Sequence, residues 1–276
     1  MGAANIKLIL TDIDGTILPR GQKLVSERTA AAMQACIDAG IHVGPASGRA
    51  ITGVLPVFEG HEGLCATALA TNGMQIYVDG EMVYEAHVPA DQLAEVAAFC
   101  ERHADEGVGL IVFEGAQVHL VSGTLEGLLA SFPSYAEVAD RVDALPDYPV
   151  VKANVFCPVD EAATRKAFED VRREVPGLDF SMPMDGFLNM TPKGWNKGSA
   201  IDVMCEHLGI GLDEVCCFGD AGNDIEMLAH VPHSVAVANA TDELKAVANY
   251  EIGPVDEESV AAFMERLAAG EDPFEG

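Results

Sequence analysis

The chain has 276 residues, of which 49% are hydrophobic, and its 44 Asp and Glu against 16 Lys and Arg residues give a formal net charge of −28 at pH 7. This apolar content is sufficient for a large core and excludes an intrinsically disordered acidic chain. Basic residues are too few to favour nucleic acid or an anionic membrane as a partner, because both are bound mainly through Lys and Arg.

The first part of the chain alternates short apolar runs with a helical pattern. Strands are predicted over 7–10, 41–46 and 66–70, and Ser26 is a suitable N-cap for a helix that ends at Gly40. Such alternation is typical of a parallel sheet with helices on both faces.

From residue 75 the pattern changes to hairpins. Two short strands flank Asp79-Gly80, a pair that favours a two-residue turn. Further helices are predicted over 91–103, 124–132 and 160–175, with strands over 110–113, 118–121, 150–156 and 178–181. We interpret this segment as a separate α+β module inserted into the first domain, with 182–185 as the linker that returns to it.

Alternation of strands and helices then resumes, with a helix predicted over 199–208 and a strand over 215–218. The expected fold class is therefore α/β. A Rossmann-like core with a parallel sheet is expected over 1–84 and 188–276, and the inserted α+β domain over 85–187.

No apolar run approaches the roughly 18 residues of a membrane span, and 8–10 is too short for a signal-peptide core. The seven cysteines are scattered, lie mostly in apolar segments and include no C-x-x-C spacing. We therefore expect buried, reduced thiols in a cytoplasmic protein.

Polar residues cluster where predicted strands end. In Asp12-Ile13-Asp14-Gly15-Thr16 the two carboxylates are two residues apart, so an extended backbone would direct both toward one site, although Asp and Gly also occur in plain turns. Ser47-Gly48-Arg49 follows the second strand and by itself could be a helix N-cap.

Two more groups lie in the last part of the chain. Lys197 precedes a predicted helix, where a cation is electrostatically unfavourable, and a bound anion would explain its position. Gly219-Asp220-Ala221-Gly222-Asn223-Asp224 follows an apolar strand, and a turn with a cap would explain only one or two of its polar residues.

In this order, the four groups resemble the motifs of the haloacid dehalogenase (HAD) superfamily of phosphohydrolases, and the inserted module resembles in placement and size the type IIB (C2B) cap of that superfamily. Asn72-Gly73 and Val237-Ala238-Asn239-Ala240 are similar to segments of the Cof-like phosphatases. Pro45 and Ala238-Asn239 depart from the residues usual in that group.

The resemblance implies a role for each motif residue. Asp12 would be the nucleophile that forms an aspartyl-phosphate, and Asp14 would be the general acid and base. Mg2+ would be bound by Asp12, the backbone carbonyl of Asp14 and Asp220, with Asp224 as a further or orienting ligand. The phosphate or substrate would be bound by Ser47, Gly48, Asn72, Lys197 and Asn223.

The charges of the motif residues indicate a metal ion independently of the family resemblance. The carboxylates of these motifs would lie beside a phosphate dianion with Lys197 as the main cation. Each pair of unit charges about 4 Å apart contributes about 4 kcal/mol at an effective dielectric constant of about 20. One Lys cannot offset this repulsion, whereas a hard divalent cation such as Mg2+, with oxygen ligands, can.

The expected function is Mg2+-dependent hydrolysis of a small phosphomonoester, with a sugar phosphate as the expected class. A phosphomutase is an alternative, because a phosphoaspartate can return its phosphoryl group to another hydroxyl. A phosphoacceptor switch and a ligand-binding protein without catalysis are others, against which Asp12, Asp14 and the inserted domain argue. The sequence predicts neither the individual substrate nor the oligomeric state.

Overall fold

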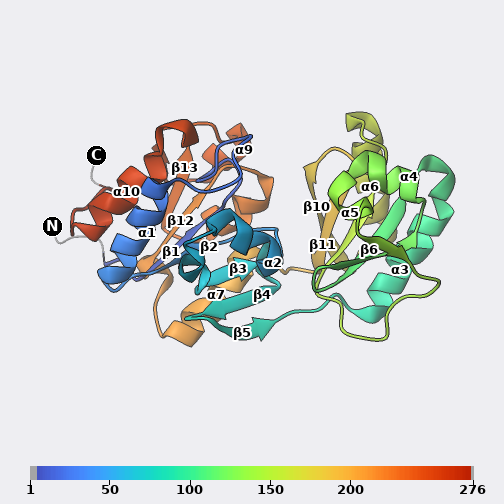
Figure 1. The fold of residues 1–276 in the computed structure, drawn as a ribbon, viewed down its shortest axis with the longest axis horizontal. Coiled ribbons are helices and arrows are strands. Elements are labelled where there is room, and N and C mark those ends of the chain that lie inside the picture. Colours follow the sequence, from blue (N-terminus) through green and yellow to red (C-terminus); the bar gives the residue numbers. More distant parts are fainter. Residues whose placement is uncertain (1–4, 275–276) are drawn as a thin grey trace. The chain divides into compact units, whose positions relative to one another are not determined.

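The computed structural model describes residues 5–274 (Figure 1). The chain divides into two compact units, which we treat separately. The core unit is the described part of Met1–Glu85 and Asn196–Gly276, and the inserted unit is Ala86–Trp195.

A parallel five-stranded sheet organises the core unit, with strand order β14-β13-β12-β1-β2. β1 lies between β12 and β2, with Leu8 opposite Val215 on one side and His42 on the other. Every residue of β1 and β12 is buried, which accounts for their mainly apolar sequences. The strands are β1 (Leu8–Thr11), β2 (His42–Pro45), β12 (Val215–Gly219), β13 (His233–Val237) and β14 (Tyr250–Ile252).

Helices cover this sheet, and α1 packs against α10 although the two lie at opposite ends of the chain (Figure 1). Ser26 caps α1 as predicted, accepting a hydrogen bond from the Thr29 N–H at 3.0 Å. The α-helices of this unit are α1 (Glu27–Asp38), α2 (Ile51–Val54), α7 (Lys197–Leu208), α8 (Ile225–His230), α9 (Asp242–Lys245) and α10 (Ser259–Ala268). Its short 3-10 helices are η1 (Leu55–Phe58), η2 (Glu62–Cys65), η3 (Thr71–Gly73), η5 (Leu212–Glu214), η6 (Gly222–Asp224) and η7 (Val255–Glu257).

The third predicted strand does not extend the parallel sheet. It belongs to an antiparallel three-stranded sheet of β3 (Ala68–Ala70), β4 (Gln75–Val78) and β5 (Glu81–Glu85). Within the described residues, a single isolated bridge, Ala46 to Leu69, joins it to the segment after β2. Pro45 has no N–H to donate, which limits pairing there. The β4–β5 turn at Asp79-Gly80 is confirmed, and both turn residues have positive φ.

The inserted unit contains a six-stranded sheet with strand order β10-β11-β9-β6-β7-β8. The expectation of a linker over 182–185 was wrong, because Met182–Met184 end β10 and a turn at Gly186 leads into β11. Pro183 and Gly186 made the hairpin resemble a loop in the sequence. The strands are β6 (Gly109–Glu114), β7 (Gln117–Ser122), β8 (Ala139–Arg141), β9 (Ala153–Phe156), β10 (Leu178–Met184) and β11 (Phe187–Pro192).

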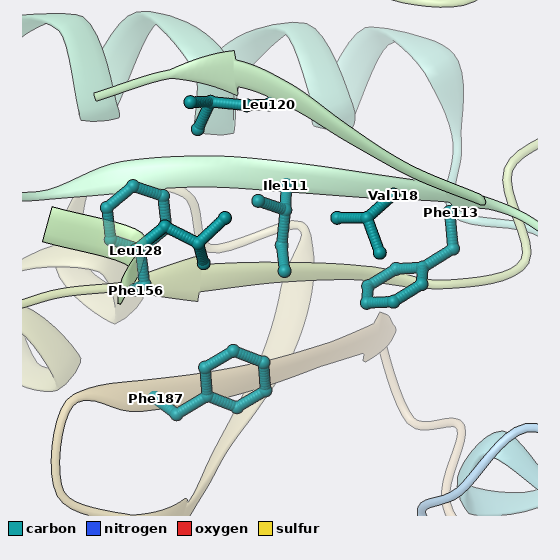
Figure 2. Packing of buried hydrophobic residues seen from close by; sticks show 7 residues of the cluster. All are labelled: Ile111, Phe113, Val118, Leu120, Leu128, Phe156 and Phe187. Atoms are coloured by element: carbon teal, nitrogen blue, oxygen red, sulfur yellow. The ribbon is translucent and has the colours of Figure 1, made fainter. Parts of the chain in front are cut away.

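Aromatic and aliphatic side chains fill one face of this sheet. Figure 2 shows the cluster formed by Ile111, Phe113, Val118, Leu120, Leu128, Phe156 and Phe187. Phe132 and Tyr135 pack against it, and their rings stack with centroids 4.2 Å apart. The helices of the inserted unit are α3 (Ala90–Arg102), η4 (Ala104–Glu106), α4 (Leu125–Ser131), α5 (Pro133–Ala136) and α6 (Glu161–Glu174).

All seven cysteines are buried and free. Within residues 5–274, no helix has both the length and the apolar character required to cross a membrane.

Candidate active site

The predicted motif residues meet where three adjacent strands of the core unit end. Asp12 follows β1, Ser47 follows β2 and Asp220 follows β12, and these strands are neighbours in the parallel sheet. The Asp12 N–H donates to the Phe218 carbonyl at 2.9 Å, which extends the pairing to the edge of the sheet. Ligands of open α/β sheets bind at this carboxyl edge.

A buried cation joins two of the carboxylates. Lys197 Nζ lies 2.8 Å from Asp12 Oδ1 and 2.6 Å from Asp224 Oδ1. Taken as whole residues, backbone included, Lys197, Asp12 and Asp224 are only 1%, 6% and 0% exposed. Charged side chains are this deeply buried only when they are paired, so the three form one unit.

Lys197 is the first residue of α7, two residues before the predicted start of this helix. Asn196 is the N-cap and Ser199 completes a capping box with it, which places the Lys197 side chain at the helix amino end. The anions that compensate this unfavourable position are Asp12 and Asp224 of the protein itself.

Asp224 also fixes the loop that carries Asp220. Its Oδ2 accepts the backbone N–H groups of Asp220 and Ala221, each at 3.2 Å, while its Oδ1 accepts from Lys197. Both oxygens of Asp224 are therefore engaged within the core unit, an arrangement that suits an orienting residue.

Asp12, Asp220 and Asp224 each offer a carboxylate oxygen, and these oxygens lie within 4.8 Å of one another. Thr16 Oγ1 donates to Asp220 Oδ1 at 2.9 Å. Gly15 has a φ of +91°, and a Cβ at this position would lie 2.4 Å from Asp220 Oδ2, so the turn after Asp14 requires glycine.

The electrostatics show an excess of negative charge. Burial, followed by repulsion from Asp224, raises the pKa of Asp12 to about 8 despite the neighbouring Lys197. The same two causes raise the pKa of Asp220 to about 6. Burial alone would lower the pKa of Lys197, but Asp12 and Asp224 outweigh it and raise that pKa, so the lysine stays charged. The oxygen-rich cluster therefore fits a divalent cation.

Residues 9–264 match the family of haloacid dehalogenase-like hydrolases. The chain belongs to this family. It is 28% identical over 265 residues to the HMP-PP phosphatase of Serratia proteamaculans, covering 94% of each chain. It is 27% identical over 272 residues to YkrA of Bacillus subtilis, covering 95% of this chain and 97% of the other.

Solved structures agree with this assignment. The HAD subclass IIB sugar phosphatase BT4131 superposes with a TM-score of 0.78 at 27% identity, covering 95% of this chain and 98% of the other. The protein is thus an enzyme of the HAD phosphatase type with the core and inserted α+β domain of subclass IIB, as its motifs predicted.

Asp14 is not part of the carboxylate cluster of this HAD hydrolase. Its side chain is 54% exposed, against 9% for Asp12, and it pairs with Arg49 instead of Lys197. The two carboxylates of the first motif therefore have different environments, one buried and one open to water.

The loop after β2 brings Ser47, Gly48 and Asn72 together. Ser47 Oγ accepts the Arg49 N–H at 3.2 Å, and the Asn72 N–H donates to the Ser47 carbonyl at 2.8 Å. A Cβ at Gly48 would lie 3.1 Å from Asn72 Oδ1. Thr71 and Asn72 both have left-handed φ, which is unusual for a β-branched residue such as Thr71. Asn72 Oδ1 is buried and finds no hydrogen-bond partner within residues 5–274.

Asn223 lies half-buried in η6, next to Asp224. Sequence reasoning assigned no role to Thr16, which is part of the first motif, or to Arg49 and Asn239, which contact that motif. Asn239 Nδ2 donates to the Gly15 carbonyl and its Oδ1 accepts the Val255 N–H, both at 2.8 Å. The only signal for these residues was their position within or beside the motifs.

Proposed function

We propose that this HAD phosphatase is Mg2+-dependent and hydrolyses a small phosphomonoester, a sugar phosphate, through a phosphoaspartate at Asp12. The observation that carries the proposal is the buried Asp12 carboxylate, 2.8 Å from Lys197 and within 4.8 Å of two more carboxylates. The similarity to BT4131, which is described as a sugar phosphatase, supports the substrate class. Selection of the leaving group is assigned to the inserted domain, which was expected over 85–187 and forms the unit Ala86–Trp195.

The metal would be held by Asp12, Asp220 and the backbone carbonyl of Asp14, with Asp224 orienting the Asp220 loop. When bound, a divalent cation supplies charge neutralisation and electrophilic assistance to the phosphoryl group. The raised pKa values of Asp12 and Asp220 support this assignment, because they reflect charge that Lys197 alone does not offset.

In the first half-reaction, an Asp12 oxygen attacks phosphorus and the bond from phosphorus to the leaving oxygen breaks. Protonated Asp14 donates its proton to that oxygen, and the free alcohol departs. Lys197 holds the Asp12 carboxylate in place and, together with Ser47, Asn72 and Asn223, binds phosphoryl oxygens. The small Gly48 lets the phosphoryl group approach the backbone.

In the second half-reaction, Asp14 takes a proton from water, and the resulting oxygen nucleophile attacks the phosphorus of phosphorylated Asp12. Inorganic phosphate leaves, the Asp12 carboxylate is regenerated and Asp14 is again protonated. The different exposure of the two residues suits these roles. Asp14 is open to water, with which it must exchange protons, whereas the nucleophile Asp12 is shielded from water.

The test is the hydrolysis of an aryl phosphate and of a panel of sugar phosphates with Mg2+ and with a chelator, with free phosphate as the readout. We expect turnover only with the cation and at least about a 1,000-fold loss in Asp12→Asn. Asp202→Asn is the matched control, since this exposed Asp on α7 pairs with His230. Undiminished turnover by Asp12→Asn would refute the nucleophile, and isomerised sugar phosphate without free phosphate would indicate a mutase.

A further inference from the structure

Arg49 donates hydrogen bonds to both carboxylate oxygens of Asp14. Nε donates to Oδ2 at 2.8 Å and Nη2 donates to Oδ1 at 2.6 Å. Two parallel N–H bonds to one carboxylate fix its direction as well as its position, which a single contact does not do.

Asp14 depends on this contact for its orientation. Its side chain is 54% exposed, and within residues 5–274 no other side chain hydrogen-bonds its carboxylate. An exposed Asp without partners exchanges among staggered rotamers within nanoseconds. Arg49 is therefore the group that keeps the carboxylate pointing in one direction.

Arg49 is itself anchored to the loop that carries Ser47. The Arg49 N–H donates to Ser47 Oγ at 3.2 Å, and the Arg49 carbonyl accepts the Thr71 N–H at 2.8 Å. Its Nη1 also lies 3.4 Å from the Gly53 carbonyl. One loop thus holds the proposed phosphoryl-binding Ser47 and the guanidinium that orients Asp14.

A second Arg–carboxylate pair of the core unit has the same form but lies between α1 and α10. Arg28 Nε and Nη2 each donate to Glu265 at 2.8 Å. The side chains are 43% and 45% exposed in this pair, against 40% and 54% for Arg49 and Asp14. Exposed ion pairs contribute little to stability. A large functional difference between the two pairs would therefore come from the site.

We propose that Arg49 is a positioning residue for proton transfer to the leaving group, acting by aiming the carboxyl group of Asp14. The inference rests on the proposed function, in which Asp14 protonates the leaving oxygen. The loss of activity on removing Arg49 should therefore be larger for a leaving group that needs a proton than for one that departs without it.

The experiment compares kcat/KM for a nitrophenyl phosphate, whose leaving group departs readily without a proton, with that for an alkyl phosphate such as a hexose phosphate, which needs one. kcat/KM reports the steps up to departure of the leaving group. General acid catalysis increases the reaction rate about 100- to 10,000-fold, and a small displacement of the acid removes a large part of this increase. We expect Arg49→Gln to lower kcat/KM about 10- to 100-fold for the alkyl ester and less than about 3-fold for the aryl ester.

Three further variants make the result specific. Arg49→Lys should recover only part of the loss, because an ammonium cannot make the paired N–H contacts. Adding Arg49→Gln to Asp14→Asn should cause no further loss on the alkyl ester, since Arg49 acts through Asp14. Arg28→Gln should leave both substrates unaffected.

An equal loss on both esters would overturn the inference in favour of a role in binding the phosphoryl group or in folding. No loss on either ester, or a further loss in the double variant, would also overturn it. Failure of the proposed function gives a different result, because the unmodified protein would then release no phosphate from either ester.

Discussion

The two units differ in what they bury. The core unit buries the ion pairs of Lys197 with Asp12 and Asp224, whereas the buried polar residues of the inserted unit are uncharged: Ser122, Ser131, Asn154 and Thr164. Lys166 of the inserted unit has two carboxylate partners, but its side chain is 56% exposed. Water solvates Lys166 and its partners in that unit, while the core unit excludes water from Lys197, Asp12 and Asp224.

The buried charges of the core unit serve the chemistry of the site and not the stability of the fold. Desolvating an ion costs several kcal/mol, and a buried pair is only weak support for a fold. Apolar contacts such as those of Phe156 and Phe187 suffice for the inserted unit. The core unit carries its costly charges at strand ends, where a nucleophile and a cation site are needed.

The largest expected effect is that of Lys197→Met. Removing this cation leaves Asp12 and Asp224 buried without their partner, so we expect the free energy of unfolding to fall by about 3–5 kcal/mol at about pH 9, above the Asp12 pKa of about 8. Urea unfolding in the presence of a chelator measures it. An unchanged unfolding midpoint would show that the carboxylates are not charged in the folded protein.

Mg2+ should stabilise the core unit through its carboxylate cluster. A ligand present at about 100 times its dissociation constant adds about 2.7 kcal/mol to the free energy of unfolding. We expect Mg2+ to raise the melting temperature of the unmodified protein but not that of Asp220→Asn. Asp179→Asn, in the inserted unit, is the control and should respond to Mg2+ like the unmodified protein. An equal response of Asp220→Asn would place the cation elsewhere.

The pH dependence of stability should reveal the raised pKa of Asp220. This pKa is about 6 in the folded protein, against an ordinary value of 3.8 that we take for the unfolded chain. Between these values the folded state binds the proton and the unfolded state does not, so the stability of the metal-free protein falls as pH rises through this window. The slope is at most about 1.4 kcal/mol per pH unit. Asp220→Asn should lack this component, and its stability advantage over the unmodified protein should grow between about pH 4 and 6 and then level off. Identical pH profiles would contradict the raised pKa.

The smallest effect is expected in the inserted unit. Lys166→Gln removes contacts to Glu106 and Asp170, but these pairs are exposed and screened by salt. We expect no measurable change in the urea midpoint. A loss comparable to that of Lys197→Met would remove the distinction between the two units.

Local patterns in the sequence predicted the elements well where one rule dominates. The apolar runs of β1 and β12 indicated buried parallel strands, and Asp79-Gly80 indicated the hairpin. Pairing between distant segments was not predicted. β11 forms a strand because it pairs with β9 and β10, although Pro183 and Gly186 precede it as in a loop.

For the candidate site, the sequence predicted which residues would gather but not how they pair. Spacing suggested that Asp12 and Asp14 face one site, yet Asp14 binds Arg49 from the next strand end. Lys197 meets Asp224 across 27 positions, and Asn239 reaches Gly15 across 224. These contacts depend on the tertiary fold, which periodicity does not encode.

The most direct test of the account is to identify the phosphorylated residue during turnover. The protein is mixed with a sugar phosphate and Mg2+, quenched in acid within milliseconds, digested and analysed by mass spectrometry. We predict one phosphoryl group on the peptide that contains Asp12, and none in Asp12→Asn. Release of free phosphate with no phosphorylated peptide, or with the phosphoryl group on another residue, would contradict the central claim.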